Sequence, residues 1–178
     1  MLVPLSWIKD YVDTKLDPKT LGDRLTEVGL GTEKIQRRET DVIFEFDITP
    51  NRPDLLSIIG IAREIAALEN KKIKYPEIKK MTKPAKFLPL KIETDYKINP
   101  RFTSIIIDNV KIGKSPDWLT GRLIKIGQRP INNIVDITNY VMFELGNPIH
   151  AFDYNKIKGK VMRVEKAKGG ERFESVDG

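Results

Sequence analysis

The sequence contains no cysteine and a single histidine, His150. The absence of cysteine excludes disulfides, thiol catalysis and zinc sites with cysteine ligands. One imidazole likewise excludes a metal site built from several histidines. No apolar run approaches the roughly 20 residues that span a membrane. The N-terminal stretch MLVPLSWIKDYVD lacks the basic segment and long apolar run of a signal peptide. These absences favour a soluble cytoplasmic protein with no membrane partner.

The sequence also lacks the short motifs that mark well-known catalytic sites. It contains no P-loop, no nucleophile elbow, no dinucleotide-binding fingerprint and no metal-binding motif. Internal repeats and low-complexity segments are absent as well. Any functional site must therefore consist of residues that belong to none of these standard motifs.

The composition is that of a globular protein with a basic excess. The 178 residues suit one ordinary domain or two small ones, and 40% of them are hydrophobic, which is enough for a buried core. The chain carries 31 Lys and Arg against 25 Asp and Glu, a net charge of +6. This excess favours a polyanion such as nucleic acid as a partner, but only weakly, because many soluble proteins are as basic.

The first part of the chain predicts helices around one strand. Ser6 can cap a short helix, and Asp17 followed by Pro18 is a typical start of a second helix, which Gly29 ends. A strand with a period of two is expected over residues 42–48. The apolar positions that share a face of the second helix are Leu21, Leu25 and Val28.

A loop and a third helix are expected next. TPNRPD, residues 49–54, contains two prolines and cannot continue a strand ladder. Ser57 then opens a helix. Its expected apolar stripe consists of Ile58, Ile61, Ala62, Ile65 and Leu68.

Residues 69–89 are rich in lysine and contain three prolines. This composition predicts a basic, extended linker between two domains. Its lysines can contact the phosphates of a nucleic acid, or they can simply be solvated, as lysine runs usually are. The candidate binding residues are Lys71, Lys72, Lys74, Lys79 and Lys80.

The second part of the chain predicts strands and two helices. Strands are expected over residues 90–94 and 102–112, the latter with a buried run from Ile105 to Ile107. Helices are expected over residues 115–127, capped by Ser115, and over residues 131–146. The end of the chain predicts a hairpin around Gly169 and Gly170.

Four residues are the candidates for chemistry: Thr138, Asn139, Pro148 and His150. Thr138 and Asn139 are polar residues on a helix dense with apolar ones. A Gly-Asn-Pro break lets the chain double back, so that His150 and Asn139 can line one pocket wall. The imidazole can orient a water and the amide can hold an oxygen of a substrate. Alternatively, both side chains merely satisfy loop carbonyl groups.

Several stretches resemble one protein family. VDITNYVMFELGNPIHAFD, residues 135–153, and FEFDITPNRPDLLSIIGIAREIAAL, residues 44–68, resemble segments of the β subunit of bacterial-type phenylalanyl-tRNA synthetase, or phenylalanine–tRNA ligase. LSWIKDYVD, residues 5–13, and LTEVGLGTEKI, residues 25–35, resemble its N-terminal domain. The stretches follow the family's order and cover nearly the whole chain, so the resemblance is specific.

The resemblance implies an α+β protein with two parts. Residues 1–80 resemble the family's small helical N-terminal domain with a β-ribbon, and residues 81–178 resemble the N-terminal portion of a mixed α/β, B3/B4-type tRNA-editing domain. That domain hydrolyses tyrosine wrongly attached to the phenylalanine tRNA. The resemblance makes His150 and Asn139 the catalytic residues of editing, acting on the aminoacyl group or the attacking water. It makes Thr138 and Pro148 substrate-binding residues of the same pocket.

The sequence departs from the family in two ways. The family usually inserts an OB-fold tRNA-binding domain between the segments at residues 25–35 and 49–54, where this chain has only residues 36–48. The family's editing pocket also uses an acidic residue from a later segment of the chain. This sequence does not contain that segment. We therefore expect an incomplete editing domain within a fragment of a longer chain, without catalytic competence on its own.

The resemblance also implies partners. In the family the α subunit binds ATP and phenylalanine, so ATP and magnesium are expected for the whole enzyme and no cofactor for this chain. The expected partners are tRNA and the α subunit, in a heterotetramer, with no DNA. One alternative is a free-standing tRNA-binding or tRNA-editing protein built from the same domain. Another is an interaction module that only docks a partner subunit.

Overall fold

The computed structural model describes residues 1–38, 40–80 and 87–174. Helices and strands both occur, so the α+β class expected from the sequence is confirmed. Within the described residues, no helix is both long and apolar enough to cross a membrane.

The chain divides into two compact units, which are described separately. The first unit consists of residues 1–80 together with residues 111–151, and the second contains the described parts of 81–110 and 152–178. A division near residue 80 was expected, but residues 111–151 pack with the first 80 residues instead of with their sequence neighbours. The expected domains, residues 1–80 and the editing-type domain of residues 81–178, stay a prediction.

The first unit contains a three-stranded antiparallel sheet in the order β1-β3-β2. The expected strand is confirmed as β3, whose Phe44 and Phe46 are buried. β2 was not expected from its residue pattern, which lacks alternation, although the resemblance implies a β-ribbon; it pairs with β3 up to Arg38 opposite Asp41. The strands are β1 (Leu2–Pro4), β2 (Gly31–Arg38) and β3 (Asp41–Asp47).

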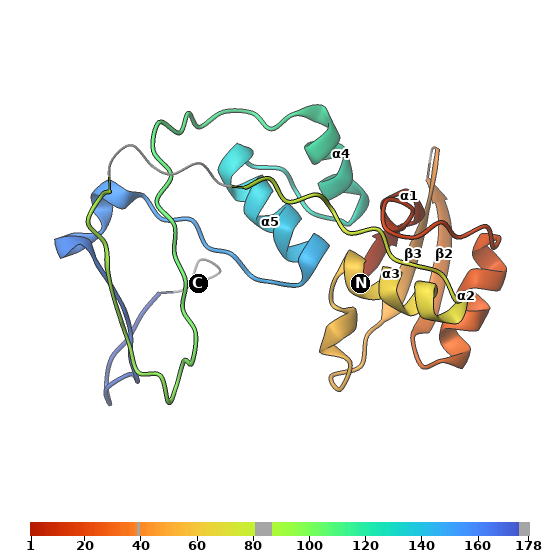
Figure 1. Cartoon of the computed structure of the whole chain (residues 1–178), viewed down its shortest axis with the longest axis horizontal. Coiled ribbons are helices and arrows are strands. Elements are labelled where there is room, and N and C mark those ends of the chain that lie inside the picture. The colour runs from red at the N-terminus through yellow and green to blue at the C-terminus, as the bar shows by residue number, and fades with distance from the viewer. Residues whose placement is uncertain (39, 81–86, 175–178) are drawn as a thin grey trace. The chain divides into compact units, whose positions relative to one another are not determined.

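Three helices accompany this sheet: two of them contact its strands, and the third packs against those two helices (Figure 1). They are α1 (Leu5–Ile8), α2 (Pro18–Glu27) and α3 (Ile58–Leu68), with a short 3-10 turn at Pro53–Leu55. The predicted caps of α2 and α3 are confirmed. Asp17 accepts hydrogen bonds from the backbone N–H groups of Lys19 and Thr20, and Ser57 accepts one from Gly60 at 3.0 Å.

Two expectations about the first helices are wrong. Ser6 does not cap α1, which begins after Pro4 without a side-chain cap. The Ser6 hydroxyl instead donates to Asp41 of β3. Val28 does not share the buried face of α2 with Leu21 and Leu25, because it lies at the C-cap, where the helix has already ended, and is 39% exposed.

Two further helices complete the first unit, α4 (Asp117–Lys125) and α5 (Asn133–Leu145). Leu119 and Leu123 of α4 are buried in the same core as α1 and α3. The predicted cap of α4 is wrong, because the helix begins after Pro116 and Ser115 donates its hydroxyl to Asp136 of α5 at 2.6 Å. The stripe of α3 enters this core as expected.

The second unit contains a parallel pair of strands, β4 (Lys91–Thr94) and β5 (Val161–Val164), which confirms the strand expected at residues 90–94. Two short 3-10 turns, Tyr154–Lys156 and Lys158–Lys160, precede β5. The Tyr154 hydroxyl donates to the carbonyl oxygen of Pro89 at 2.8 Å and ties the turn to the start of β4.

Two expectations about strands are wrong. Residues 102–112 form no strand, and Ile105 and Ile107 are 58% and 70% exposed. Around Gly169 and Gly170 the described residues form no hairpin, since residues 171–174 are in no strand; residues 175–178 lie outside the described residues. A β-branched run becomes a strand only when a neighbouring strand completes its ladder.

Candidate functional site

The four predicted editing residues lie on α5 and the loop that follows it. Thr138 and Asn139 are partly exposed on the helix, while Pro148 and His150 are exposed on the loop. The arrangement brings Thr138 and Asn139 together as neighbours on one helix. Whether His150 joins them in a pocket stays a prediction.

The loop leaves α5 through Gly146, which is in the left-handed region with φ 77°. A side chain there would be strained, and its Cβ would lie 3.2 Å from the Cβ of Ser57. The C-terminal end of α5 is therefore held close to the start of α3. This contact fixes the point from which the chain runs to Pro148 and His150.

The Thr138 hydroxyl donates to the backbone carbonyl of Val135 at 2.7 Å. Its proton is thereby used within the helix, and its oxygen remains an acceptor for a substrate group. Among the described residues, the side chains of Asn139 and His150 have no hydrogen-bond partner. Both can therefore bind a molecule from solvent without breaking an existing bond.

Two small cavities lie elsewhere. One, of about 340 Å³, is next to the start of α2, and the other, of about 270 Å³, is beside β4 and β5. Neither is lined by a predicted site residue.

A set of polar contacts on another face of α5 was missed from the sequence. We name Asp136, Tyr140 and Glu144 the anchor stripe, because they are spaced by four residues along one helix face. Asp136 is only 1% exposed and accepts hydrogen bonds from the Ser115 hydroxyl at 2.6 Å and the Ile131 backbone N–H at 2.7 Å. The spacing of four was the only signal of this stripe in the sequence.

Tyr140 packs between two tryptophans. Its ring stacks on Trp7 of α1 with 5.0 Å between ring centres, and the edge of Trp118 meets it at 5.4 Å. The guanidinium group of Arg122 lies 5.1 Å from the centre of the Trp7 ring, within the range of a cation–π contact. Aromatic contacts therefore join α1, α4 and α5.

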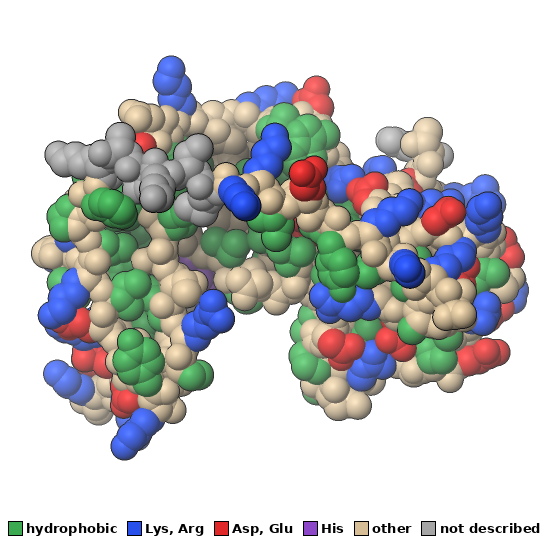
Figure 2. Space-filling model, viewed as in Figure 1, with side chains coloured by type: hydrophobic (Ala, Val, Ile, Leu, Met, Phe, Trp, Pro, Cys, Tyr) green, Lys and Arg blue, Asp and Glu red, His purple; other side chains and the backbone are tan. Residues whose placement is uncertain are grey.

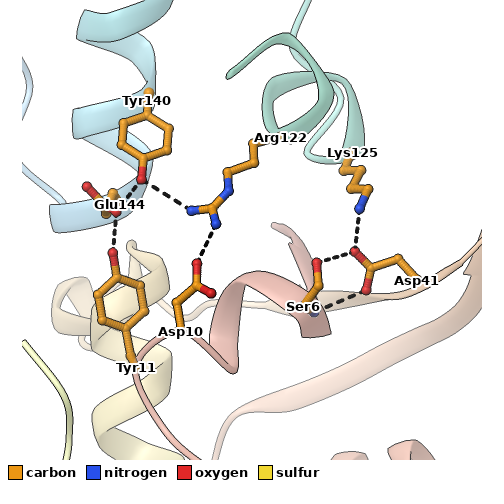
Figure 3. Close-up of polar contacts among 8 residues, drawn as sticks. All are labelled: Ser6, Asp10, Tyr11, Asp41, Arg122, Lys125, Tyr140 and Glu144. Atoms are coloured by element: carbon orange, nitrogen blue, oxygen red, sulfur yellow. Dashed lines mark hydrogen bonds and ion pairs between the residues drawn. The ribbon is translucent and has the colours of Figure 1, made fainter. Parts of the chain in front are cut away.

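Hydrogen bonds close this cluster, as Figure 3 shows. Glu144 accepts from the hydroxyls of Tyr11 and Tyr140, the latter at 2.5 Å. Arg122 donates to the Tyr140 hydroxyl at 3.2 Å and to Asp10. Burial, together with the bonds to Glu144, raises the pKa of both tyrosine hydroxyls well above the ordinary value. Both therefore remain protonated donors at neutral pH.

A second polar contact joins α4 to the sheet. Asp41 of β3 is 7% exposed, and it accepts from the Ser6 backbone N–H at 3.1 Å and from Lys125 at 2.8 Å (Figure 3). Burial alone would raise the pKa of Asp41, but the bonds from Lys125 and Ser6 outweigh it and the pKa is lowered. Asp41 is therefore a charged, paired group at neutral pH.

The predicted lysine-rich linker is partly attached to the first unit. Lys71 pairs with Glu69 at 2.6 Å and also donates to the carbonyl oxygen of Asp13. The backbone N–H of Lys74 donates to the carbonyl oxygen of Tyr11 at 2.7 Å. The side chains of the other candidate lysines are exposed: Lys72, Lys74, Lys79 and Lys80. On the face shown in Figure 2, basic side chains are interspersed with acidic ones.

Comparison with known proteins relates the chain to one family. Residues 98–178 match the family model of the B3/4 domain. The chain is 48% identical over 141 residues to the phenylalanine–tRNA ligase β subunit of Fusobacterium nucleatum, and 41% identical over 180 residues to that of Rhodopirellula baltica. It is 38% identical over 174 residues to that of Geobacillus kaustophilus. The predicted family resemblance is thereby confirmed.

The alignments differ in what they cover. They include 78%, 99% and 93% of this chain, but only 17%, 26% and 22% of the three relatives. The chain thus spans about a quarter or less of the length of the curated relatives it matches. The Rhodopirellula baltica alignment is hardly longer than this 178-residue chain, so it holds no insertion as large as an OB fold.

Proposed function

We propose that this chain, which is homologous to phenylalanine–tRNA ligase β subunits, supports the charging of the phenylalanine tRNA through tRNA contact, subunit assembly and proofreading of Tyr-tRNA in the cytoplasm. The observation that carries the proposal is the relationship itself. It extends over 99% of this chain at 41% identity, and a B3/4 domain match covers residues 98–178. The proposed partners are tRNA and the synthetase α subunit.

Proofreading is needed because tyrosine differs from phenylalanine only by a hydroxyl. A binding pocket for phenylalanine rejects such an analogue poorly by exclusion, and hydrolysis after attachment improves the discrimination. In the proposed reaction, water attacks the ester carbonyl carbon of Tyr-tRNA. The bond between that carbon and the ribose oxygen breaks, and the ribose oxygen leaves with a proton.

The site residues divide this work. His150 orients the attacking water and accepts its proton, and the Asn139 amide donates to the carbonyl or ribose oxygen. Thr138 and Pro148 bind the aminoacyl group. The exposure of His150 and Pro148 supports these roles, because a tRNA end can reach them.

Activation of the amino acid is assigned to the α subunit. Within the described residues, no group of three or more His, Asp or Glu side chains could hold a metal ion. We assign this chain's own residues no step that uses ATP.

The test uses the complete β chain assembled with its α partner. His150→Ala should slow the hydrolysis of preformed Tyr-tRNA by about tenfold to a thousandfold, the range for losing one positioned acid–base or hydrogen-bonding group. Asn139→Ala should act in the same direction. Charging with phenylalanine should be nearly unchanged, and its rate is the control for correct assembly.

Equal deacylation rates for wild type and His150→Ala would show that His150 is only a loop residue. Robust deacylation by residues 1–178 alone would instead favour the free-standing editing protein.

A further inference from the structure

We propose that the anchor stripe, Asp136, Tyr140 and Glu144, is a set of positioning residues that fixes the rotation of α5 about its axis and so aims Thr138 and Asn139. This inference rests on the proposed editing function, because it concerns how the residues of that site are held. None of the three touches the substrate in this proposal. They act through the helix that carries Thr138 and Asn139.

Helix geometry links the two sets of residues. Successive residues on an α-helix are turned by about 100°, so Asn139 points about 100° and Thr138 about 160° away from Tyr140. The anchor stripe bonds to or stacks on Tyr11, Ser115 and Trp7, which lie on or beside α1 and α4. A roll of the helix would therefore redirect Thr138 and Asn139 by the same angle.

Both ends of α5 are held against such a roll. Near its start, Asp136 accepts from the Ser115 hydroxyl and the Ile131 N–H. Near its end, Glu144 accepts from Tyr11, which lies 133 residues earlier in the sequence. Tyr140, between them, also donates to Glu144 at 2.5 Å and packs on Trp7. The contacts span about two turns of the helix.

Apolar packing alone would not choose this orientation. α5 carries apolar residues all round, and Ile137 and Leu145 remain 50% and 44% exposed. Burial of apolar area is non-directional, so rotations that bury another apolar side are close in energy. Hydrogen bonds with fixed partners are directional and distinguish between such arrangements. The buried Asp136 and the Glu144 cluster thus select one rotation of α5.

The experiment measures Tyr-tRNA deacylation by the complete β chain with its α partner. Tyr140→Phe keeps the ring packed on Trp7 but removes the hydroxyl that bonds to Glu144 and Arg122. We expect kcat to fall about tenfold to a hundredfold with KM for tRNA unchanged, because small misplacements of reacting groups act on the chemical step. Glu144→Gln keeps an acceptor oxygen and should lose less activity than Glu144→Leu.

The matched control is Tyr96→Phe. It removes the same hydroxyl from a tyrosine that is 74% exposed, and it should change neither kcat nor KM. Charging with phenylalanine should stay at the wild-type rate in every variant. A fall of charging and deacylation in equal proportion would indicate loss of folded protein and would overturn the positioning role.

A second readout does not depend on editing. The 178-residue chain has no cysteine, so Asn139→Cys introduces a single thiol whose rate of labelling by a maleimide reports its exposure. Adding Tyr140→Phe or Glu144→Leu should change that rate severalfold, whereas adding Tyr96→Phe should not. Unchanged labelling would overturn the proposal.

The two readouts also distinguish failure of the proposed editing function from failure of the positioning role. If wild type does not hydrolyse Tyr-tRNA, the proposed function fails, while altered labelling still supports the fixed rotation of α5. If Asn139→Ala slows deacylation and Tyr140→Phe does not, the function stands and the positioning role is wrong.

Discussion

Asp41 is a carboxylate whose charge matters to the fold. Its side chain is buried at the start of β3, the central strand of the sheet, and Lys125 is its one charged partner among the described residues. The lowered pKa means that the folded state binds the proton of Asp41 less tightly than the unfolded state does. Its stabilising contribution is therefore present above the ordinary Asp pKa of about 3.9 and is lost as the pH falls through the lower folded pKa.

Lys125→Met should make this contribution visible. Met keeps an apolar stem of similar length but removes the charge, which leaves Asp41 buried without its cation. We expect the free energy of unfolding to fall by about 1–2 kcal/mol at neutral pH, below the full value for a charged hydrogen bond because Lys125 is partly exposed. Urea unfolding measures it, and the difference from wild type should shrink as Asp41 becomes protonated.

The control for this prediction is Lys19→Met. Lys19 pairs with Asp23 at 2.6 Å, but both side chains are well exposed, so its loss should change stability little at any pH. Equal effects of the two substitutions would show that burial of Asp41 does not strengthen its pair.

Helix caps show what could be predicted at the scale of an element. The caps at Asp17 and Ser57 were predicted correctly, because each side chain bonds to a backbone N–H two or three residues ahead. Ser6 and Ser115 carry the same local signal, yet each hydroxyl donates to a buried carboxylate, Asp41 or Asp136. Those partners are 35 and 21 residues away, so a local pattern cannot reveal them.

The candidate site was predictable to the same limited extent. The helix that carries Thr138 and Asn139 follows from its own residues, with Asn132 as a cap and Gly146 at its end. Its orientation depends on Trp7, Tyr11 and Arg122 from other elements, and only the fold brings these together. The run at residues 102–112 shows the opposite case, because its β propensity predicted a strand, yet none of these residues is in a strand.

Two glycines in helices should respond to substitution in opposite ways. A Cβ on Gly60 of α3 would lie 1.9 Å from the backbone carbonyl oxygen of Asp54, which cannot yield without moving the loop. A Cβ on Gly121 of α4 would meet no neighbouring atom within 4 Å, and the φ angle of Gly121 is not positive. Gly60→Ala should therefore destabilise by roughly 3 kcal/mol or more, and Gly121→Ala should stabilise by up to about 1 kcal/mol. Thermal unfolding of both variants shows whether each one is destabilised or stabilised. Destabilisation by Gly121→Ala would contradict the open space expected around its Cβ.

The first unit combines segments that are far apart in the sequence. Leu119 and Leu123 of α4 are buried with the apolar side chains of residues 1–80, and Arg122 and Lys125 form ion pairs across the same contact. A chain of residues 1–80 would expose this surface to water. We expect its unfolding free energy to be lower than that of residues 1–151 by roughly 2–5 kcal/mol, the value of a few buried apolar side chains. Urea unfolding followed by tryptophan fluorescence makes the comparison, and equal midpoints would show that α4 and α5 add nothing to this core.

The proposed binding of tRNA would involve the charge of the whole molecule. Net charge is +6, and the exposed lysines of the linker extend along a segment without regular structure. Replacing Lys72, Lys74, Lys79 and Lys80 by Gln should weaken tRNA binding, because each lysine that neutralises a phosphate releases a counterion. The slope of log affinity against log salt should fall by about 0.7–0.9 for each lysine in contact.

Lys71→Gln is the matched control within the same segment. Its ammonium group already pairs with Glu69 and the Asp13 carbonyl, so its loss should leave the salt slope nearly unchanged. Filter binding of the phenylalanine tRNA across a salt series gives both quantities. An unchanged slope in the fourfold variant would mean that these lysines are only solvated. An equal drop with Lys71→Gln would mean that the ion pair with Glu69 opens when tRNA binds.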